Sequence, residues 1–303
     1  MAFFDSAMGF FVKFWVEFRR ELCYDIVVSI WVLLRPYDFP NEGEIIPMAN
    51  PHTIAVAGKG GVGKTTTCGM LIDYLCKKNR GPVLVVDADA NSNLNEVLGV
   101  EVETSLGSIR EEIAQAELKG TIPASMTKAD YADFKFNSAL IEDDDFDMLV
   151  MGRTQGKGCY CFVNGLLQRL MDKYAHNYSY VVMDNEAGLE HVARGTLPHV
   201  DTMLLISDCS RRGVQAVARL AEMINEMELN PTQMGLIINR APNGILSEGV
   251  KAEIDRHGLK LIGVLPQDES VYQCDCDGEP SARLPENNPV KTALRGIMES
   301  LGL

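Results

Sequence analysis

The stretch AVAGKGGVGKTTT, residues 55–67, decides the fold. From Gly58 to Thr65 it fits the phosphate-loop pattern G-x-x-x-x-G-K-[ST] in full, between an apolar run and a stretch of helical character. That context makes the pattern specific. Glycines let backbone N–H groups converge on phosphate oxygens, and the N-terminus of the following helix adds its positive end. The sequence therefore predicts a loop that binds the phosphates of a nucleotide.

Two lysines lie in this loop, and only one of them is needed to hold phosphates. Lys64 is expected to reach the β- and γ-phosphates, and the Thr65 hydroxyl is expected to bind Mg²⁺. Lys59 adds a second charge, which is useful where negative charge develops during phosphoryl transfer. The loop residues predicted to contact the nucleotide are Gly58, Gly60, Gly61, Val62, Gly63, Lys64, Thr65 and Thr66.

Apolar runs alternate with helical stretches from His52 onward. The runs are TIAVAG, PVLVVDAD, FDMLVMG, YVVMDNEAG, DTMLLISD, MGLIINR and LIGVLP. Continuous apolar runs between helices are typical of strands that are covered on both faces, so we expect an α/β P-loop NTPase fold with a doubly wound, mostly parallel sheet of about seven strands. Ligands bind such sheets at the carboxyl ends of the strands. The acidic stretch EDDDFD (142–147) is interpreted as a solvated loop that enters a strand.

Residues 1–47 differ in character from the ATPase domain predicted for residues 48–303. They combine apolar residues at helical spacing with IVVSIWVLL, a nine-residue run. A run of that length is too short to cross a bilayer, which takes roughly 20 residues. Three interpretations stay open: a membrane-surface or partner-binding helix, a segment packed on the main domain, or a protein that truly starts at Met48. Membrane contact through residues 1–47 is not the favoured one.

Composition narrows the function classes. The net charge of -14 argues against sequence-independent nucleic-acid binding, which needs a basic face. The chain has eight cysteines, and its start does not match a secretory signal peptide. We therefore expect a cytoplasmic protein whose paired cysteines bind metal or act in redox chemistry rather than form disulfides.

Aspartates follow two of the predicted strands. VVDADANSNL carries Asp87 and Asp89, and VVMDNEAGLEH carries Asp184. A nucleotide hydrolase needs one group near Mg²⁺ and another that places the attacking water. Strand-end aspartates also serve as plain helix caps, but three of them beside a complete phosphate loop favour a magnesium and water site, with Asp184 as the Walker B carboxylate.

GKGGVGKTT resembles the deviant Walker A motif of the superfamily that contains MinD, ParA, the nitrogenase iron protein and ArsA. In that superfamily the early lysine contacts nucleotide across a dimer interface. The resemblance therefore implies an ATP-dependent homodimer in which Lys59 acts in trans. It also implies that Asp89 orients the attacking water, that Asp87 lies near magnesium through water, and that EAG after Asp184 senses the γ-phosphate.

The resemblance places base recognition in two further loops. The superfamily contacts adenine through loops that match IINR and VLPQDE here, so Asn239 and Arg240 are expected to bind the nucleotide. Asn239 is the predicted base contact. The guanine-binding pattern N-K-x-D is absent from the sequence, which favours ATP over GTP.

Cys159 and Cys161 form a C-x-C pair. Thiolates suit Zn²⁺, Ni²⁺ or Cu⁺, and two sulfurs this close in sequence can reach one ion. Two thiolates leave a four-coordinate ion half open, and a symmetric dimer would supply the other two. Inert structural cysteines are the alternative interpretation.

GKGCYCFVN, DNEAGLEH and SDCSRRGVQ are similar to stretches of the CooC-type nickel-insertion ATPases, which include AcsF. The similarity runs from about residue 52 to the end. It implies that Cys159 and Cys161 bind Ni²⁺ or Zn²⁺ at a dimer interface. It also implies that ATP turnover is coupled to metal delivery, with carbon monoxide dehydrogenase or acetyl-CoA synthase as the client.

Three features depart from that family or stay open. Cys209 stands where the family has proline and is expected to be a small buried residue. Cys274 and Cys276 lie in a predicted loop, where an auxiliary metal site is one interpretation. His191 is interpreted as a surface or packing residue, with a transient metal contact as the alternative.

Two rival functions remain. One is a redox ATPase with an intersubunit iron–sulfur cluster, like the nitrogenase iron protein, although the cysteines of that family are well separated in sequence. The other is a ParA/MinD-like positioning ATPase. The final stretch VKTALRGIMESLGL is amphipathic but carries only Lys291 and Arg295 as basic residues, so core packing is favoured over contact with an anionic membrane.

Overall fold

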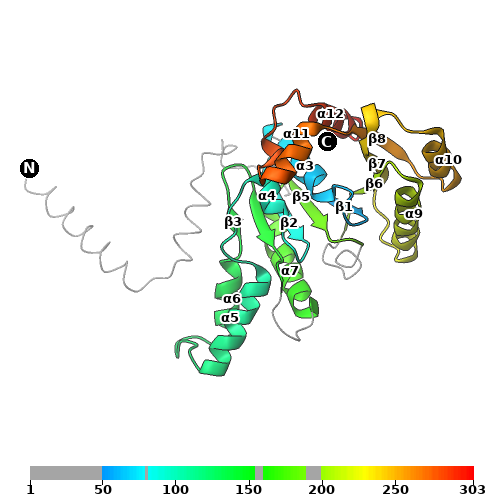
Figure 1. Cartoon of the computed structure of the whole chain (residues 1–303). Helices are drawn as coiled ribbons and strands as arrows, with labels where there is room; N and C mark the ends of the chain where they lie inside the picture. Colours follow the sequence, from blue (N-terminus) through cyan, green and yellow to red (C-terminus); the bar gives the residue numbers. More distant parts are fainter. Residues whose placement is uncertain (1–49, 79–80, 154–159, 189–198) are drawn as a thin grey trace, which may run out of the picture. The chain divides into compact units, whose positions relative to one another are not determined.

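An eight-stranded sheet with helices on both faces forms the body of the molecule (Figure 1). The computed structural model describes residues 50–78, 81–153, 160–188 and 199–303. The strands are β1 (His52–Gly58), β2 (Val83–Ala88), β3 (Ile141–Glu142), β4 (Asp147–Val150), β5 (Tyr180–Asn185), β6 (Thr202–Asp208), β7 (Gln233–Ala241) and β8 (Leu261–Pro266). Their order is β3-β4-β2-β5-β1-β6-β7-β8, and every pair except β3–β4 is parallel. The predicted doubly wound, mostly parallel sheet is confirmed.

The eighth strand, β3, is the one element of the sheet that the sequence did not predict. All seven predicted runs form strands. β3 has only two residues, and its Glu142 opens the acidic stretch that was interpreted as a solvated loop entering the next strand. It pairs with β4 in antiparallel register, Glu142 opposite Asp147, across a turn closed by a hydrogen bond from the Asp143 N–H to the Phe146 carbonyl (3.0 Å). Such a short edge strand carries no apolar run that a sequence pattern could detect.

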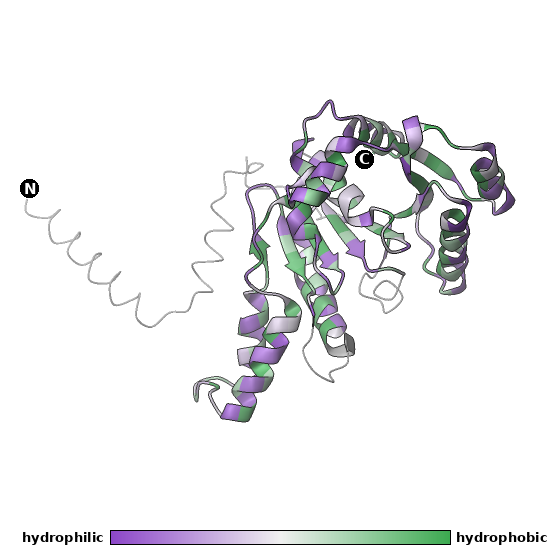
Figure 2. Ribbon diagram, in the orientation of Figure 1, coloured by the Kyte–Doolittle hydropathy of each residue, from purple (hydrophilic) through white to green (hydrophobic). Residues whose placement is uncertain are grey.

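Two hydrophobic cores lie on opposite faces of the sheet. One contains residues of α5, α6, α7, α9 and α10, and the other contains residues of α3, α4 and α12. The helices are α3 (Lys64–Lys77), α4 (Leu94–Leu98), α5 (Leu106–Lys119), α6 (Lys128–Asn137), α7 (Tyr160–Tyr174), α9 (Arg211–Glu226), α10 (Glu248–Arg256), α11 (Glu269–Asp277) and α12 (Pro289–Ser300). Figure 2 shows hydrophobic colour along the central strands and mixed colour on the helices, as expected for strands covered on both faces.

The position of β1 in the middle of the sheet places the phosphate loop at the centre of the molecule. Ala55 and Ala57 point into one core, and Ile54 and Val56 point into the other. β5 flanks β1 on one side and β6 flanks it on the other, so the order of the strands along the chain reverses at β1. The carboxyl end of a strand at such a reversal of order is where ligands bind in this fold class.

The last helix, α12, packs in a core as predicted. Val290, Leu294, Ile297 and Met298 on this helix are buried in the core that also contains α3. Among the described helices, none is both long and apolar enough to cross a bilayer. The predicted boundary between residues 1–47 and the ATPase domain lies outside the described residues and stays a prediction.

Lys291 on α12 is a buried cation rather than a surface charge. Its side chain is 4% exposed, and its Nζ lies 2.6 Å from Asp73 Oδ2 of α3 and 2.9 Å from Glu286 Oε1. It also donates to the carbonyls of Ala282 (3.0 Å) and Leu284 (2.9 Å). One ammonium group therefore joins α12, α3 and the segment that precedes α12.

Replacing Lys291 with methionine should lower the free energy of unfolding by about 3 kcal/mol, because it leaves two buried carbonyls without their donor and Asp73 with only the half-exposed Lys77 as its cation. Arg295→Ala is the matched control. Arg295 pairs with Glu286 at 2.7 Å near the surface, so its loss should cost less than ~1 kcal/mol. Urea unfolding of both variants measures the difference, and equal losses would contradict the buried role of Lys291.

Candidate nucleotide site

The phosphate loop takes a conformation that needs glycine at its last position before the helix. Gly63, the N-cap of α3, has φ +87° in the left-handed region. A Cβ built there would lie 2.3 Å from Nδ2 of Asn239, so no other residue fits. The helix has no side-chain N-cap, which leaves its first backbone N–H groups available to an anion.

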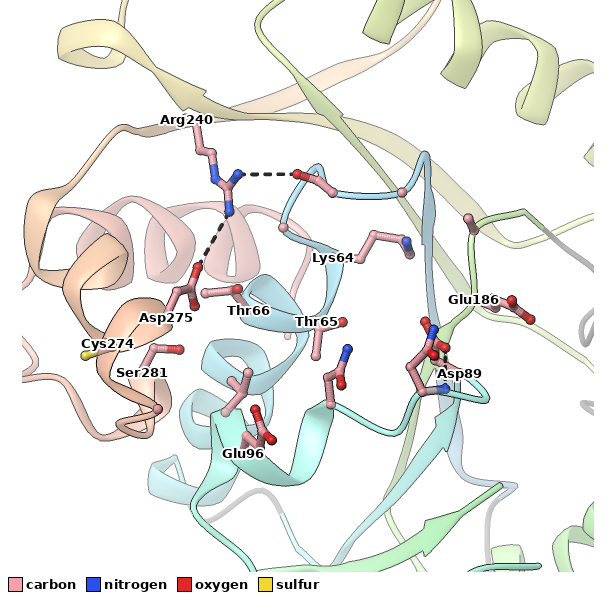
Figure 3. Close-up of a pocket in the computed structure, with 18 of the residues that line it drawn as sticks. Lys64, Thr65, Thr66, Asp89, Glu96, Glu186, Arg240, Cys274, Asp275 and Ser281 are labelled. Carbon is pink, nitrogen blue, oxygen red and sulfur yellow. Dashed lines mark hydrogen bonds and ion pairs between the residues drawn. The ribbon is translucent and has the colours of Figure 1, made fainter. Parts of the chain in front are cut away.

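The two loop lysines point to different surroundings. Lys64 is 7% exposed, and its Nζ donates to the Lys59 carbonyl at 3.4 Å. In Figure 3 it extends toward the side of the cavity that holds Asp89 and Glu186. Lys59 itself is exposed. One lysine is thus enclosed in its own site and the other is available to a neighbouring molecule, while the trans role of Lys59 stays a prediction.

Asp87 and Asp184 lie side by side at the carboxyl ends of β2 and β5, where they are partners in the parallel register. Both are buried. Asp87 accepts the N–H groups of Asp89 (3.0 Å) and Leu94 (3.2 Å), which shapes the turn after β2. Asp184 accepts a hydrogen bond from the Thr65 hydroxyl. The structure therefore brings together the predicted magnesium and water-placing carboxylates next to the phosphate loop.

Burial disfavours the ionised form of both carboxylates. It raises the pKa of Asp87 to about 7, and the charge of Asp184 adds to the shift. It raises the pKa of Asp184 to about 6, although the Thr65 hydroxyl and the Lys64 ammonium act in the opposite direction. Two buried like charges in contact disfavour each other, and a bound cation would relieve both.

The donor groups at Thr65 and Asp184 fit Mg²⁺. Asp184 is 1% exposed, and its Oδ1 has no hydrogen-bond partner among the described residues. A buried acceptor without a partner is costly unless a ligand or water completes it. Hydroxyl and carboxylate oxygens are the ligands that Mg²⁺ prefers. The chemistry of this pair therefore matches the predicted magnesium site.

A cavity of about 560 Å³ opens in front of the phosphate loop (Figure 3). The predicted site residues that line it are Gly60, Gly61, Gly63, Lys64, Thr65, Thr66, Asp89 and Arg240. Gly58, Val62, Asp87, Asp184 and Asn239 are buried behind this lining. Glu186 and Ala187, from the EAG segment predicted to sense the γ-phosphate, also line it. Residues that line it without having been predicted include Asn91, Asn93, Glu96, Asp275 and Ser281. The first three follow Asp89 and could have been found from their place directly after a strand end.

The wall formed by α11 was missed because its sequence was interpreted as a loop. Asp268 accepts the Val271 N–H at 3.1 Å as the N-cap, and Gly278 with φ +70° ends the helix. An N-cap aspartate and a terminal glycine are the usual helix boundary signals. Cys274 and Cys276 therefore lie two positions apart on a helix and face different directions, so the auxiliary metal site is wrong for this pair. Among the described residues, no three or more His, Cys, Asp or Glu side chains are grouped so that they could hold a metal ion by themselves.

Asn239 and Arg240 brace the phosphate loop from β7. Asn239 Nδ2 donates to the Val62 carbonyl (2.9 Å), and the Arg240 guanidinium donates to the Gly61 carbonyl (3.3 Å). Both residues also line a second cavity of about 280 Å³ with Gln267, from the VLPQDE stretch. The two predicted base-recognition loops thus meet beside the phosphate loop. The base contact itself stays a prediction.

The cysteine pair falls at the edge of what the structure describes. Cys159 lies outside the described residues, as does His191, and Cys161 belongs to the first turn of α7 with its side chain not described. Cys209 is half-buried rather than fully buried, because it sits at the rim of a core with its Sγ 3.5 Å from the Arg240 carbonyl.

Replacing Asp184 with asparagine should stabilise the nucleotide-free protein relative to wild type as the pH rises from 4 to 6. The folded-state pKa is raised, so the folded protein holds this proton longer than the unfolded chain, and ionisation above pH 4 favours unfolding. The gain should reach the order of 2 kcal/mol and level off above about pH 6. Urea unfolding at several pH values measures it; a difference independent of pH would contradict the raised pKa.

Comparison with known proteins gives relatives across most of the chain. An uncharacterized ATP-binding protein of Methanocaldococcus jannaschii is 44% identical over 248 residues, which cover 82% of this chain and 97% of the relative. The carbon monoxide dehydrogenase accessory protein CooC of Rhodospirillum rubrum is 28% identical over 251 residues, covering 74% and 87%. Among solved structures, the septum site-determining protein MinD of Pyrococcus horikoshii, complexed with Mg-ADP, superposes with a TM-score of 0.59. It has 19% identity and covers 83% of this chain and 96% of that one, which shows the shared fold.

The family described as "CobQ/CobB/MinD/ParA nucleotide binding domain" matches residues 53–281. That range includes the phosphate loop, the carboxylates at the ends of β2 and β5, and the α11 wall of the cavity. The chain belongs to this family of nucleotide-binding proteins.

Proposed function

We propose that the protein is a cytoplasmic, ATP-dependent homodimeric metallochaperone that carries Ni²⁺ to carbon monoxide dehydrogenase or acetyl-CoA synthase. The observation that carries the proposal is the combination of a complete nucleotide site, with its exposed Lys59, and a C-x-C pair in the sequence whose second cysteine, Cys161, belongs to the first turn of α7. The relationship to the carbon monoxide dehydrogenase accessory protein CooC supports the client class.

In this proposal the chain hydrolyses ATP, and Lys64 and Asp89, which line one cavity, take part in the reaction. Lys64 holds the β- and γ-phosphates from inside the loop, and the N–H groups at the start of α3 bind their oxygens. Asp89 orients the attacking water toward the γ-phosphorus, with ADP as the leaving group. Lys59 of the second subunit neutralises the charge that develops during transfer.

Thr65 and Asp184 would hold Mg²⁺, Asp87 lying behind them. Bound there, the ion supplies charge neutralisation on the β- and γ-phosphate oxygens. A divalent cation held by Asp184 would favour its ionised form and offset the cost of burying this carboxylate, whose Oδ1 has no hydrogen-bond partner among the described residues.

Nickel is the cargo in this proposal. Cys159 and Cys161 from each subunit supply four thiolates, which suit Ni²⁺ or Zn²⁺. The same dimer that places Lys59 across from a nucleotide would complete this set, so nucleotide binding and metal binding depend on one interface. Hydrolysis would loosen that interface and release the metal to the client.

A ParA/MinD-like positioning ATPase is the second candidate, because the description of the matched family names MinD and ParA. It shares the nucleotide site and the dimer and lacks the metal cargo. An iron–sulfur redox ATPase is less favoured because two cysteines separated by one residue differ from the spacing in the nitrogenase iron protein.

Replacing Lys59 with alanine should abolish dimerisation by ATP while leaving ADP affinity within about twofold of wild type, since Lys59 lies outside its own cavity. Lys64→Ala is the contrasting variant and should weaken ADP binding itself. Light scattering gives the mass and calorimetry gives the affinity. Loss of ADP affinity in the Lys59 variant would contradict its trans role.

Replacing Cys159 and Cys161 together with alanine should abolish the uptake of one Ni²⁺ per dimer while nucleotide affinity is retained. The paired change Cys274→Ala with Cys276→Ala is the control and should keep nickel binding, because that pair faces two directions on α11. Anaerobic titration of the reduced, full-length protein measures both.

Unchanged nickel binding after loss of Cys159 and Cys161 would overturn the metal-site assignment. A wild-type protein that dimerises with ATP but takes up no metal would favour the positioning ATPase.

A further inference from the structure

Two cavities meet at one ion pair beside the phosphate loop. The larger cavity contains the loop, and the smaller one contains Asn239, the predicted base contact. Both are lined by Thr66, Arg240 and Asp275, so these three residues lie at the boundary between them. Arg240 Nη2 lies 3.6 Å from Asp275 Oδ2 (Figure 3). A nucleotide with its phosphates at the loop and its base beside Asn239 must cross this boundary.

The Arg240 side of the pair has a fixed backbone. Its φ is +55°, in the left-handed region that residues other than glycine rarely adopt. The Arg240 N–H donates to Asn239 Oδ1 at 2.9 Å, and Asn239 Nδ2 donates to the Val62 carbonyl at 2.9 Å. One asparagine side chain thus joins the end of β7 to the phosphate loop. The Arg240 guanidinium is therefore held at the edge of the loop, where it donates to the Gly61 carbonyl at 3.3 Å.

The Asp275 side of the pair is held more loosely. Asp275 belongs to α11, which the structure describes in full, and none of the nine residues of this helix is buried. Val271 packs against a core and is partly buried, and Asn288 Nδ2 donates to the N-cap Asp268 at 3.1 Å. Both attachments lie in the first half of the helix, and Asp275 lies in the second. Segments with few buried contacts move at little free-energy cost, so α11 can shift more easily than the loop.

The pair uses a cation that a phosphate group would also bind. The Arg240 side chain is 51% exposed and that of Asp275 is 36% exposed. An ion pair this exposed contributes little to stability and opens readily. A guanidinium binds phosphate oxygens at least as well as a carboxylate, and the Asp275 carboxylate repels an anionic ligand. The pair therefore opposes the binding of a nucleotide across the boundary.

We propose that Asp275 is a positioning residue that holds the Arg240 guanidinium at the boundary and weakens nucleotide binding until the pair opens. The inference rests on the proposed function only in that the chain binds nucleotide, and the metal cargo plays no part in it. When nucleotide binds, the guanidinium exchanges the Asp275 carboxylate for a phosphate oxygen. The two cavities then act as one site.

Calorimetric titration of the full-length protein with Mg-ADP tests the inference. Asp275→Asn removes the charge that holds Arg240, so it should tighten ADP binding about three- to fivefold, the range expected for one half-exposed ion pair. Asp275→Glu keeps a carboxylate at this position and should restore the affinity to near that of the wild type. A folding defect would weaken binding rather than tighten it, so the sign of the change separates the two explanations.

Asp277→Asn is the matched control. Asp277 lies on the same helix and is exposed, it accepts a hydrogen bond from Gln273 at 2.8 Å, and it lines neither cavity. The same change of charge should therefore alter ADP affinity by less than about twofold.

Arg240→Gln completes a double-mutant cycle and should by itself weaken ADP binding. In that background Asp275→Asn should change ADP affinity by less than about twofold, because no guanidinium is left to release.

Weaker ADP binding in Asp275→Asn would overturn the inference, because Asp275 would then hold the nucleotide itself. Equal tightening in Asp277→Asn, or a full effect of Asp275→Asn without Arg240, would overturn it as well. None of these results changes the proposed function, whose dimerisation and nickel uptake are measured separately. A wild-type protein that binds no ADP would reject the proposed function together with the inference.

Discussion

The contact between two buried carboxylates, Asp87 and Asp184, organises the rest of the site. Parallel pairing of β2 and β5 forces them into register, and the low-polarity interior makes it unfavourable for both to be charged. The neighbouring polar groups offset this cost. The Thr65 hydroxyl and the Lys64 ammonium lie beside Asp184, and the N–H groups of the turn after β2 bind Asp87. The positive charge of a magnesium ion would offset the repulsion between the two carboxylates.

The sheet places this pair within reach of distant parts of the chain. β1 and β5 bring the phosphate loop and Asp184 together, while β7 supplies the side chains that support the loop from behind. The turn after β2 places Asp89 and Asn91 at the cavity, and the Asn91 side chain accepts a hydrogen bond from Arg153, which follows β4.

Sequence patterns predicted the parts of the molecule where a local residue pattern is compatible with a single structure. The loop around Lys64, the seven long strands and the strand-end aspartates belong to this class. The patterns were weaker where the outcome depends on tertiary packing. Lys291 was identified as a basic residue of an amphipathic helix, yet its burial depends on Asp73 in a helix more than 200 residues earlier. The α11 wall was missed because the segment with its two cysteines was interpreted as a loop, although Asp268 is a helix N-cap. β3 was missed because two residues make no pattern.

The cavity in front of the phosphate loop is built from opposite ends of the chain. Its floor comes from the segment that opens α3, and its far wall comes from α11 and Ser281. During synthesis the phosphate loop leaves the ribosome early, while the wall leaves it late. A ligand stabilises only the state that binds it. A nascent chain that has emerged only as far as β7 therefore gains little from the cell's nucleotide pool, and nucleotide can act as a folding aid only after α11 has emerged.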